Sequence, residues 1–157
     1  MKNILALVDF SEITAEVVTQ SAHLASIFQA KCWILHVAAP DPDFVGFKVG
    51  PEYIRDARAE ELRSEHRRLA EFQQQVSEQG VTCTALLVQG HTGQAILEEV
   101  EKLEIGLIVL GSHGHGAVYE IFAGSVAGFL LQKSPVPLYV LPAGTARVRP
   151  VQSEGRS

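Results

Sequence analysis

Five short runs of apolar residues, rich in β-branched side chains, alternate along the chain with longer stretches of mixed polarity. The short runs are almost continuously hydrophobic, which is typical of strands that are covered on both faces of a sheet. They span Ile4–Val8, Cys32–Val37, Thr82–Val88, Leu107–Leu110 and Val136–Leu141. The pattern therefore predicts five buried strands.

The stretches between these runs carry apolar residues at helical spacing and predict four helices. They are a helix with Ile13, Val17, Leu24 and Phe28 on its inner face, a charge-dense helix over Pro51–Gln79, a helix over about Thr92–Leu103, and a helix from Gly124-Ser125 to about Lys133. Gly80 supplies a stop for the second helix, and Ser134-Pro135 ends the fourth.

Strands and helices alternate throughout, which favours an α/β fold with a parallel sheet and right-handed crossovers. We expect one domain over residues 1–142 and a disordered polar tail over 143–157. The stretch from Ala38 to Gly50 predicts a long loop. A packed surface loop is favoured there over a mobile flap that covers a site.

Composition excludes some classes of function. The 157 residues are 46% hydrophobic and 20% charged, as in an ordinary globular protein, and the net charge of −5 argues against nucleic acid or an anionic membrane as the main partner. No apolar run is long enough to span a membrane. The only two cysteines, Cys32 and Cys83, fall in predicted strands. We expect both thiols to be buried and reduced, in a cytoplasmic protein.

A glycine-rich segment follows the fourth predicted strand. Gly111, Gly114 and Gly116 cluster where that strand ends. The pair Gly124-Ser125 then opens the next apolar stretch. A strand, a glycine-rich loop and a helix start together offer unpaired backbone N–H groups to an anion. Glycine has no Cβ to obstruct a phosphate, so we interpret the segment as a nucleotide phosphate site.

Asp9 directly follows the first predicted strand. In an open parallel α/β sheet, ligands bind beyond the carboxyl ends of the strands, where the strand order reverses. If the first and fourth strands are neighbours, Asp9 lies beside the glycine loop, where its carboxylate can accept hydrogen bonds from ribose hydroxyls. Alternatively, Asp9 or Ser11 caps the first helix. Both roles are compatible if Ser11 is the cap and Asp9 faces the ligand.

Several motifs occur in order along the chain. They are Asp9 within Leu-Val-Asp-Phe-Ser-Glu, Leu35-His36-Val37, Gly90-x2-Gly93-x-Ala95-Ile96, Gly111-x2-Gly114-x9-Gly124-Ser125, Gly124-Ser-Val-Ala127 and Pro135-Val-Pro-Leu138. Over roughly Lys2 to Leu141, this series resembles the ATP-binding branch of the universal stress protein family. A single glycine triplet carries little information, whereas several motifs in the right order are specific.

The resemblance implies a doubly wound, Rossmann-like sheet of strand order 3-2-1-4-5 with helices on both faces. It implies that an adenine slot lies against the first two strands, that Asp9 and the backbone near Gly111 hold the ribose, and that backbone N–H groups hold the phosphates. The residues expected to contact the nucleotide are Leu7, Val8, Asp9, Val37, Gly111, Ser112, His113, Gly114, His115, Gly124, Ser125 and Val126.

The resemblance also implies a homodimer that pairs through the last strand, Val136–Leu141, and Mg²⁺ or Mn²⁺ beside the phosphates. We therefore expect a dimeric protein that binds ATP, or another adenine nucleotide, as a switch or sensor of the stress response. It would act on a protein partner that the sequence does not identify, and it would hydrolyse ATP slowly at most.

Three positions depart from the family's pattern. His115 stands where many relatives carry Arg, so a titratable group replaces a permanent positive charge near the phosphates. Gly106 stands where an Asp often precedes the fourth strand, and Leu7 replaces a proline near the base.

Two other classes of function are compatible with the sequence. A nucleotide-independent interaction protein of the same fold and a slow ATPase or adenylate-handling enzyme both stay open. The chain lacks the Gly-Lys-Ser/Thr ending of a phosphate-binding Walker loop. Ser125 has no evident His–Asp partnership, so its hydroxyl is interpreted as a ligand and no catalytic residue is predicted.

A transition-metal site is the weaker interpretation of the histidines. His113 and His115 alternate in the glycine segment, with His36 and His91 as further candidates, but no carboxylate or cysteine stands at supporting spacing. The charge-dense second helix, Glu52 to Glu78, is more typical of a solvated face than of a partner surface.

Overall fold

The computed structural model describes residues 1–40, 52–112 and 126–142. Most of the stretch from Ala38 to Gly50 falls outside these ranges, and so does the predicted tail over 143–157. The glycine-rich segment is described only up to Ser112 and again from Val126.

The described residues form five strands and four helices in the predicted alternation. In chain order they are β1 (Asn3–Leu7), α1 (Thr14–Phe28), β2 (Lys31–Ala38), α2 (Glu52–Glu78), β3 (Cys83–Gln89), α3 (Thr92–Lys102), β4 (Leu107–Gly111), α4 (Val126–Lys133) and β5 (Leu138–Leu141). Gly80 adopts a φ of 81° just after α2, where a residue without a Cβ is needed to end the helix.

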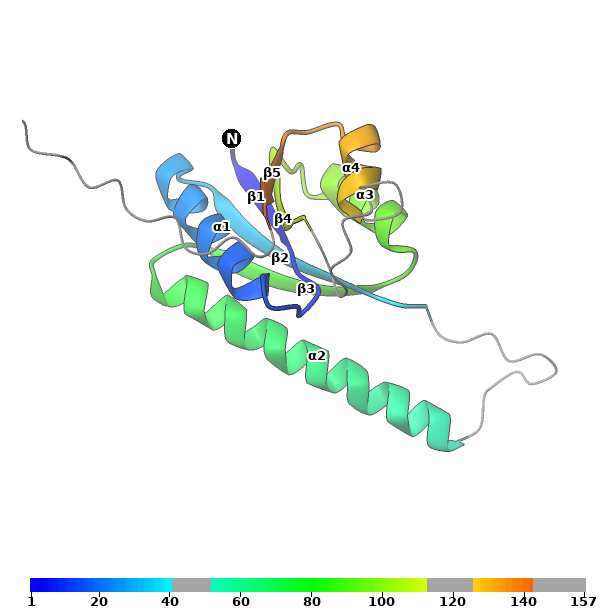
Figure 1. Cartoon of the computed structure of the whole chain (residues 1–157). Coiled ribbons are helices and arrows are strands. Elements are labelled where there is room, and N and C mark those ends of the chain that lie inside the picture. The colour runs from blue at the N-terminus through cyan, green and yellow to red at the C-terminus, as the bar shows by residue number, and fades with distance from the viewer. Residues whose placement is uncertain (41–51, 113–125, 143–157) are drawn as a thin grey trace, which may run out of the picture.

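The strands build one parallel sheet in the order β3-β2-β1-β4-β5, which confirms the expected doubly wound fold. Figure 1 shows α1 and α2 against one face of this sheet and α3 and α4 against the other. Strands β1 and β4 are direct neighbours, although α1 and α4 follow them on opposite faces. The strand order therefore reverses between β1 and β4.

Two apolar cores lie on the two faces of the sheet. Alternate residues of one strand supply them, because successive side chains of a strand point to opposite faces. Ile4 and Ala6 of β1 pack on the side of α1 and α2, together with Leu69 of α2. Leu5 of β1 packs on the other side, with Leu130 of α4. Burial on both faces explains why the sequence of each strand is almost continuously hydrophobic.

The sequence prediction needs correction at the start of β5 and at the end of α1. Strand β5 begins at Leu138 rather than Val136, because Pro137 has no N–H to donate and only its carbonyl joins the ladder, accepting from the Ile108 N–H at 3.1 Å. Phe28 was expected on the inner face of α1 but is 46% exposed. It is the last residue of the helix, and Ala25 and Ala30 fill the core at that end.

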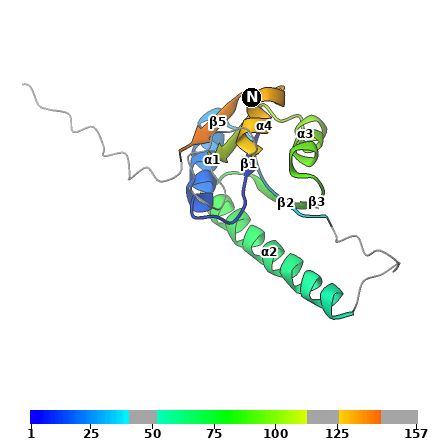
Figure 2. The ribbon, with the colours of Figure 1, turned by 45° about the vertical axis from the view of Figure 1, so that its right-hand side comes forward.

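The buried residues of helix α2 lie in its second half. Leu69 and Val76 are its only buried residues. Its first half extends away from the sheet, as both views show (Figure 2). Exposed ion pairs line that half, where Glu60 binds Arg63 at 3.1 Å and Arg67 at 3.3 Å. The pKa of the Glu60 carboxyl is lowered by the hydrogen bonds from Arg67 and Arg63.

Strands β3 and β5 are the two edges of the described sheet. At the β3 edge, the side-chain oxygen of Gln73 in α2 accepts a hydrogen bond of 2.7 Å from the Ala85 N–H. An edge N–H group that would otherwise be free to pair is thus satisfied from within the chain. At the β5 edge, Tyr139 is 39% exposed.

The two cysteines face each other across the β2–β3 ladder. Cys32 is buried and Cys83 is half-buried, both as free thiols, so the expected burial holds fully only for Cys32. The Cys32 thiol hydrogen-bonds Cys83, which raises the pKa of Cys32 and lowers that of Cys83. Burial raises the pKa of Cys32 further, and the nearby Lys31 lowers that of Cys83.

We expect Cys83 to react with iodoacetamide in the native protein at lower pH than an ordinary thiol, because the thiolate is the nucleophile. Cys32 is expected to react only after unfolding. Mass spectrometry of the alkylated protein across a pH series measures both rates, with Cys83→Ser as the control. Equal labelling of the two thiols in the native protein would contradict the prediction.

Candidate functional site

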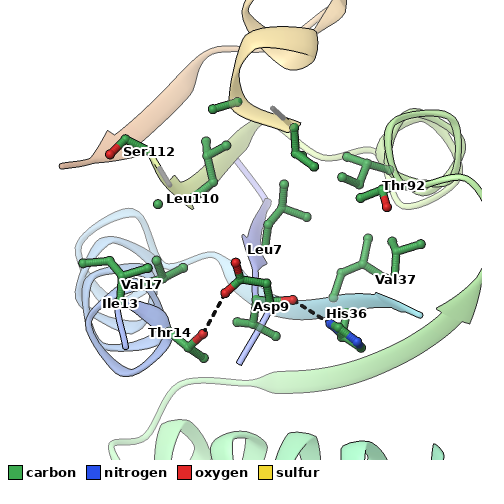
Figure 3. A pocket seen from close by; sticks show the side chains of 16 residues that line it. Leu7, Asp9, Ile13, Thr14, Val17, His36, Val37, Thr92, Leu110 and Ser112 are labelled. Carbon is green, nitrogen blue, oxygen red and sulfur yellow. Dashed lines mark hydrogen bonds between the residues drawn. The ribbon is translucent and has the colours of Figure 1, made fainter. Parts of the chain in front are cut away.

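A pocket of about 420 Å³ opens at the carboxyl ends of β1, β2 and β4. Figure 3 shows side chains from the strand ends and from the flanking helices converging on it. Its lining consists of Leu7, Val8, Asp9, Ile13, Thr14, Val17, Leu35, His36, Val37, Thr92, Ile96, Leu110, Gly111, Ser112, Val126 and Ala127. This is the point where the strand order reverses, the usual ligand position in a doubly wound sheet.

Asp9 is exposed at the edge of this pocket, in the turn between β1 and α1. Its Oδ1 accepts a hydrogen bond of 3.0 Å from the Ser11 N–H and one of 3.3 Å from the Thr14 hydroxyl. The second bond is drawn in Figure 3. Helix α1 begins after Ile13 without a side-chain cap, so the expected Ser11 cap is not formed. Asp9 organises the turn instead, as Asp often does through its own following N–H groups.

The residues on both sides of Asp9, Val8 and Phe10, contact residues of other elements. The Nδ1–H of His36 in β2 donates a hydrogen bond of 2.8 Å to the Val8 carbonyl. Phe10 adopts a φ of 61°, and its ring lies 4.6 Å from the His36 ring. The guanidinium of Arg68 in α2 lies over the Phe10 ring, 4.1 Å from its centroid.

Gly111 ends β4 at the floor of the pocket, directly against the Ile13 side chain. A Cβ at Gly111 would lie 2.7 Å from Cγ2 of Ile13, closer than side chains pack. Helix α4 begins across the pocket, where Val126 and Ala127 belong to the lining. The N-terminal end of a helix carries a partial positive charge, so it suits an anion.

The structure brings seven of the predicted contact residues to this pocket and leaves the others outside its described part. Those in the lining are Leu7, Val8, Asp9, Val37, Gly111, Ser112 and Val126. His113, Gly114, His115, Gly124 and Ser125 fall within residues 113–125, which the structure does not describe.

Several lining residues were not predicted from the sequence. Thr14 and Ile13 belong to the start of α1, and Thr92 and Ile96 to α3. Their apolar or helix-start character is equally typical of core and cap positions, so no chemical signal marked them. His36 lies within a motif quoted for the family resemblance, but its contacts with the β1–α1 turn depend on the fold.

The described residues form neither a cluster of metal-binding side chains nor a membrane-spanning helix. Residues 1–40, 52–112 and 126–142 contain no group of three or more His, Cys, Asp or Glu side chains that could hold a metal ion. The expectation about His113 and His115 concerns residues outside these ranges. No helix in this part of the chain is both long and apolar enough to cross a membrane.

Fold and pocket together define a doubly wound α/β protein with a pocket at the reversal of strand order. The family model of the universal stress proteins matches residues 1–142. The chain therefore belongs to the universal stress protein family, as the motifs predicted.

Relatives of known sequence agree with this assignment. The chain is 28% identical over 142 residues to the universal stress protein YxiE of Bacillus subtilis, which covers 87% of this chain and 96% of the relative. It is 29% identical over 142 residues to a universal stress protein of Thermus aquaticus, covering 89% of this chain and 98% of the relative.

Solved structures share the fold at lower identity. UspA from Lactobacillus plantarum superposes with a TM-score of 0.77 at 21% identity, over 89% of this chain and 97% of its own. A family protein from Arabidopsis thaliana with AMP bound gives 0.61 at 19% identity, over 90% and 92% of the two chains. A protein from Archaeoglobus fulgidus in complex with dAMP gives 0.59 at 18% identity, over 89% and 96%.

Proposed function

We propose that this chain binds an adenine nucleotide, such as ATP, in the pocket at the ends of β1 and β4. The observation that carries the proposal is the coincidence of the pocket, the Asp9 carboxylate and the start of α4 at the reversal of strand order. Its volume of about 420 Å³ is in the range of small-molecule sites. Structural relatives described as complexes with AMP and dAMP support the choice of an adenine nucleotide.

Each part of a nucleotide meets suitable groups in this proposal. Leu7 and Val37 offer apolar surface to the adenine ring. The Asp9 carboxylate accepts hydrogen bonds from ribose hydroxyls, and the N–H groups at the start of α4 receive phosphate oxygens. The proposed contacts of Gly114, Gly124 and Ser125, and of Mg²⁺ or Mn²⁺, rest on the family resemblance alone.

Replacing Asp9 by Asn is expected to weaken ATP binding by about 10- to 100-fold, because hydrogen bonds to a charged acceptor contribute about 1.5–3 kcal/mol. The Asn side-chain oxygen can still accept from the Ser11 N–H and the Thr14 hydroxyl, so the turn is kept. Isothermal titration calorimetry with ATP and Mg²⁺ measures the change.

Glu12→Gln is the matched control, because Glu12 is an exposed carboxylate three residues further along and lies outside the pocket lining. Its affinity for ATP should equal that of the wild type. An unchanged affinity in Asp9→Asn would remove the ribose contact. Failure of the wild-type protein to bind ATP, ADP or AMP would refute the nucleotide function and favour a nucleotide-independent interaction protein.

In this proposal the protein acts as a switch or sensor in a homodimer that pairs through β5, and its ATP hydrolysis is slow at most. The edge position of β5 and the exposure of Tyr139 support pairing at that strand. Light scattering after gel filtration, with and without ATP, tests the dimer by its mass. Steady release of phosphate from ATP by the wild type would instead favour an ATPase.

A further inference from the structure

The turn that carries Asp9 is held in a conformation that its own sequence does not favour. Phe10 has a φ of 61°, in the left-handed region that a bulky side chain rarely adopts. Such a conformation is strained and persists only where the surroundings over-determine it. Contacts from outside the turn must therefore hold Phe10, and with it the backbone next to Asp9.

His36 provides the first of these contacts. A carbonyl only accepts hydrogen bonds, so the 2.8 Å bond to Val8 requires a proton on Nδ1 of the His36 ring. The opposite nitrogen, Nε2, lies 3.4 Å from Oε1 of Glu65 in α2. Both side chains are largely buried, with exposed fractions of 12% and 17%. His36 thus joins the end of β1 to α2.

Glu65 has no other hydrogen-bonding partner among the described residues. Its second carboxylate oxygen, Oε2, is buried and unpaired in this part of the chain. Burying a carboxylate is costly unless it is paired with a polar or charged group. The His36 ring is the partner that the described structure provides for Glu65. The position of Glu65 is consistent with a role in orienting the His36 ring.

Arg68, one helical turn along α2 from Glu65, holds the other side of the turn. Its guanidinium lies 4.1 Å from the Phe10 ring centroid, a cation–π distance, and its Nη2 lies 3.5 Å from the Phe10 carbonyl. The Phe10 ring is therefore in contact with His36 and with Arg68. The carbonyls of Val8 and Phe10, the residues before and after Asp9, are thus both held from outside the turn.

We infer that His36, Glu65 and Arg68 form a bracket that positions the Asp9 carboxylate for the ribose of the bound nucleotide. This inference rests on the proposed function and deepens it. Glu65 and Arg68 are absent from the pocket lining, so they act on the ligand indirectly, through the turn and through His36, which does line the pocket. They are positioning residues, and α2 becomes a structural support of the ribose site.

The magnitudes agree with such a role. A displaced binding group loses its own hydrogen bonds although it is still present, so the effect on affinity can exceed that of the lost cation–π contact itself. Loss of one bracket contact should therefore weaken the ribose contacts by about threefold to tenfold. The start of α4 belongs to another element, and Leu7 and Val37 are held in the sheet by their ladder partners Leu35 and Val88. Binding of the phosphates and of the base should therefore be unaffected.

Glu65→Ala and Arg68→Ala test the bracket, each measured with ATP and with 2′,3′-dideoxy-ATP, which lacks both ribose hydroxyls. Glu60→Ala and Arg67→Ala are matched controls on the same helix, because those residues pair with each other on the exposed face. We expect the two bracket variants to lose about threefold to tenfold in affinity for ATP and less than about twofold for the dideoxy analogue. The controls should bind both as the wild type does.

A purely structural role would weaken ATP and the dideoxy analogue alike, and that result would overturn the inference. Equal affinities of wild type and bracket variants for ATP would overturn it as well. Glu65→Gln can hydrogen-bond Nε2 of the His36 ring through its amide, as donor or as acceptor, and should restore most of the ATP affinity, which separates loss of the contact from misfolding.

A measurement without nucleotide separates this inference from the proposed function. The Ser11 amide donates to Asp9, so its hydrogen exchange reports the order of the turn. We expect faster exchange of Ser11 in Glu65→Ala and Arg68→Ala than in Arg67→Ala. Unchanged exchange would overturn the bracket. If Ser11 exchanges faster in the two bracket variants but the wild-type protein binds no nucleotide, the bracket stands and only its role at the ribose is refuted.

Discussion

Leu130→Ala is expected to lower the free energy of unfolding by about 2–5 kcal/mol, the range for removing a fully buried leucine side chain. Leu130 lies on the inner face of α4, is 0% exposed and packs into the core beside α3. Helix α4 spans only Val126–Lys133. A helix this short depends on packing rather than on its own hydrogen bonds, so the loss of this contact should release it.

Leu131→Ala is the matched control, because the neighbouring residue is the same amino acid but is 58% exposed. Its effect should stay within about 0.5 kcal/mol, as is usual for surface positions. Urea unfolding followed by circular dichroism measures both variants, provided that the slope with denaturant is unchanged. Equal losses in the two variants would mean that α4 does not pack as described.

Gly111→Ala is expected to lower the free energy of unfolding by about 1–3 kcal/mol, as is typical of overpacking. The added Cβ would lie 2.7 Å from Cγ2 of Ile13. Ile13 is β-branched and cannot easily turn its side chain away. Since both residues line the pocket, the same change should also weaken ATP binding.

A double-mutant cycle distinguishes this clash from other effects at Gly111. In an Ile13→Ala background the clashing Cγ2 is gone, and the alanine Cβ lies 3.6 Å from the position of the new methyl group. The cost of Gly111→Ala should then fall to within about 0.5 kcal/mol. A cost that is the same in both backgrounds would show that Gly111 is required for another reason.

The element order could be predicted from the sequence, because buried parallel strands leave an unmistakable apolar run. The strand order could not be obtained from periodicity and depended on the family resemblance. Element ends were less accurate. At β5, the apolar run includes Val136, but Pro137 has no N–H for the ladder and the strand starts after it. At Phe28, helical spacing alone does not show that the core ends before the helix does.

The candidate site was predictable where chemistry and position coincide. Asp9 and Gly111 stand at strand ends and are polar or lack a side chain, which sets them apart from the core. The support of the Asp9 turn was not predictable. Arg68 and Phe10 are 58 positions apart, and the left-handed conformation of Phe10 has no signal in an ordinary Phe-Ser dipeptide.

The capping of the β3 edge by Gln73 has a consequence for self-assembly. A sheet that offers two open edges can add copies of itself without limit and grow into a fibre. Here a side-chain amide already occupies the Ala85 N–H on one border. In the proposed dimer, strand addition at β5 would use up that border of both molecules. Further growth would then have to start at β3, where Gln73 competes for the Ala85 N–H.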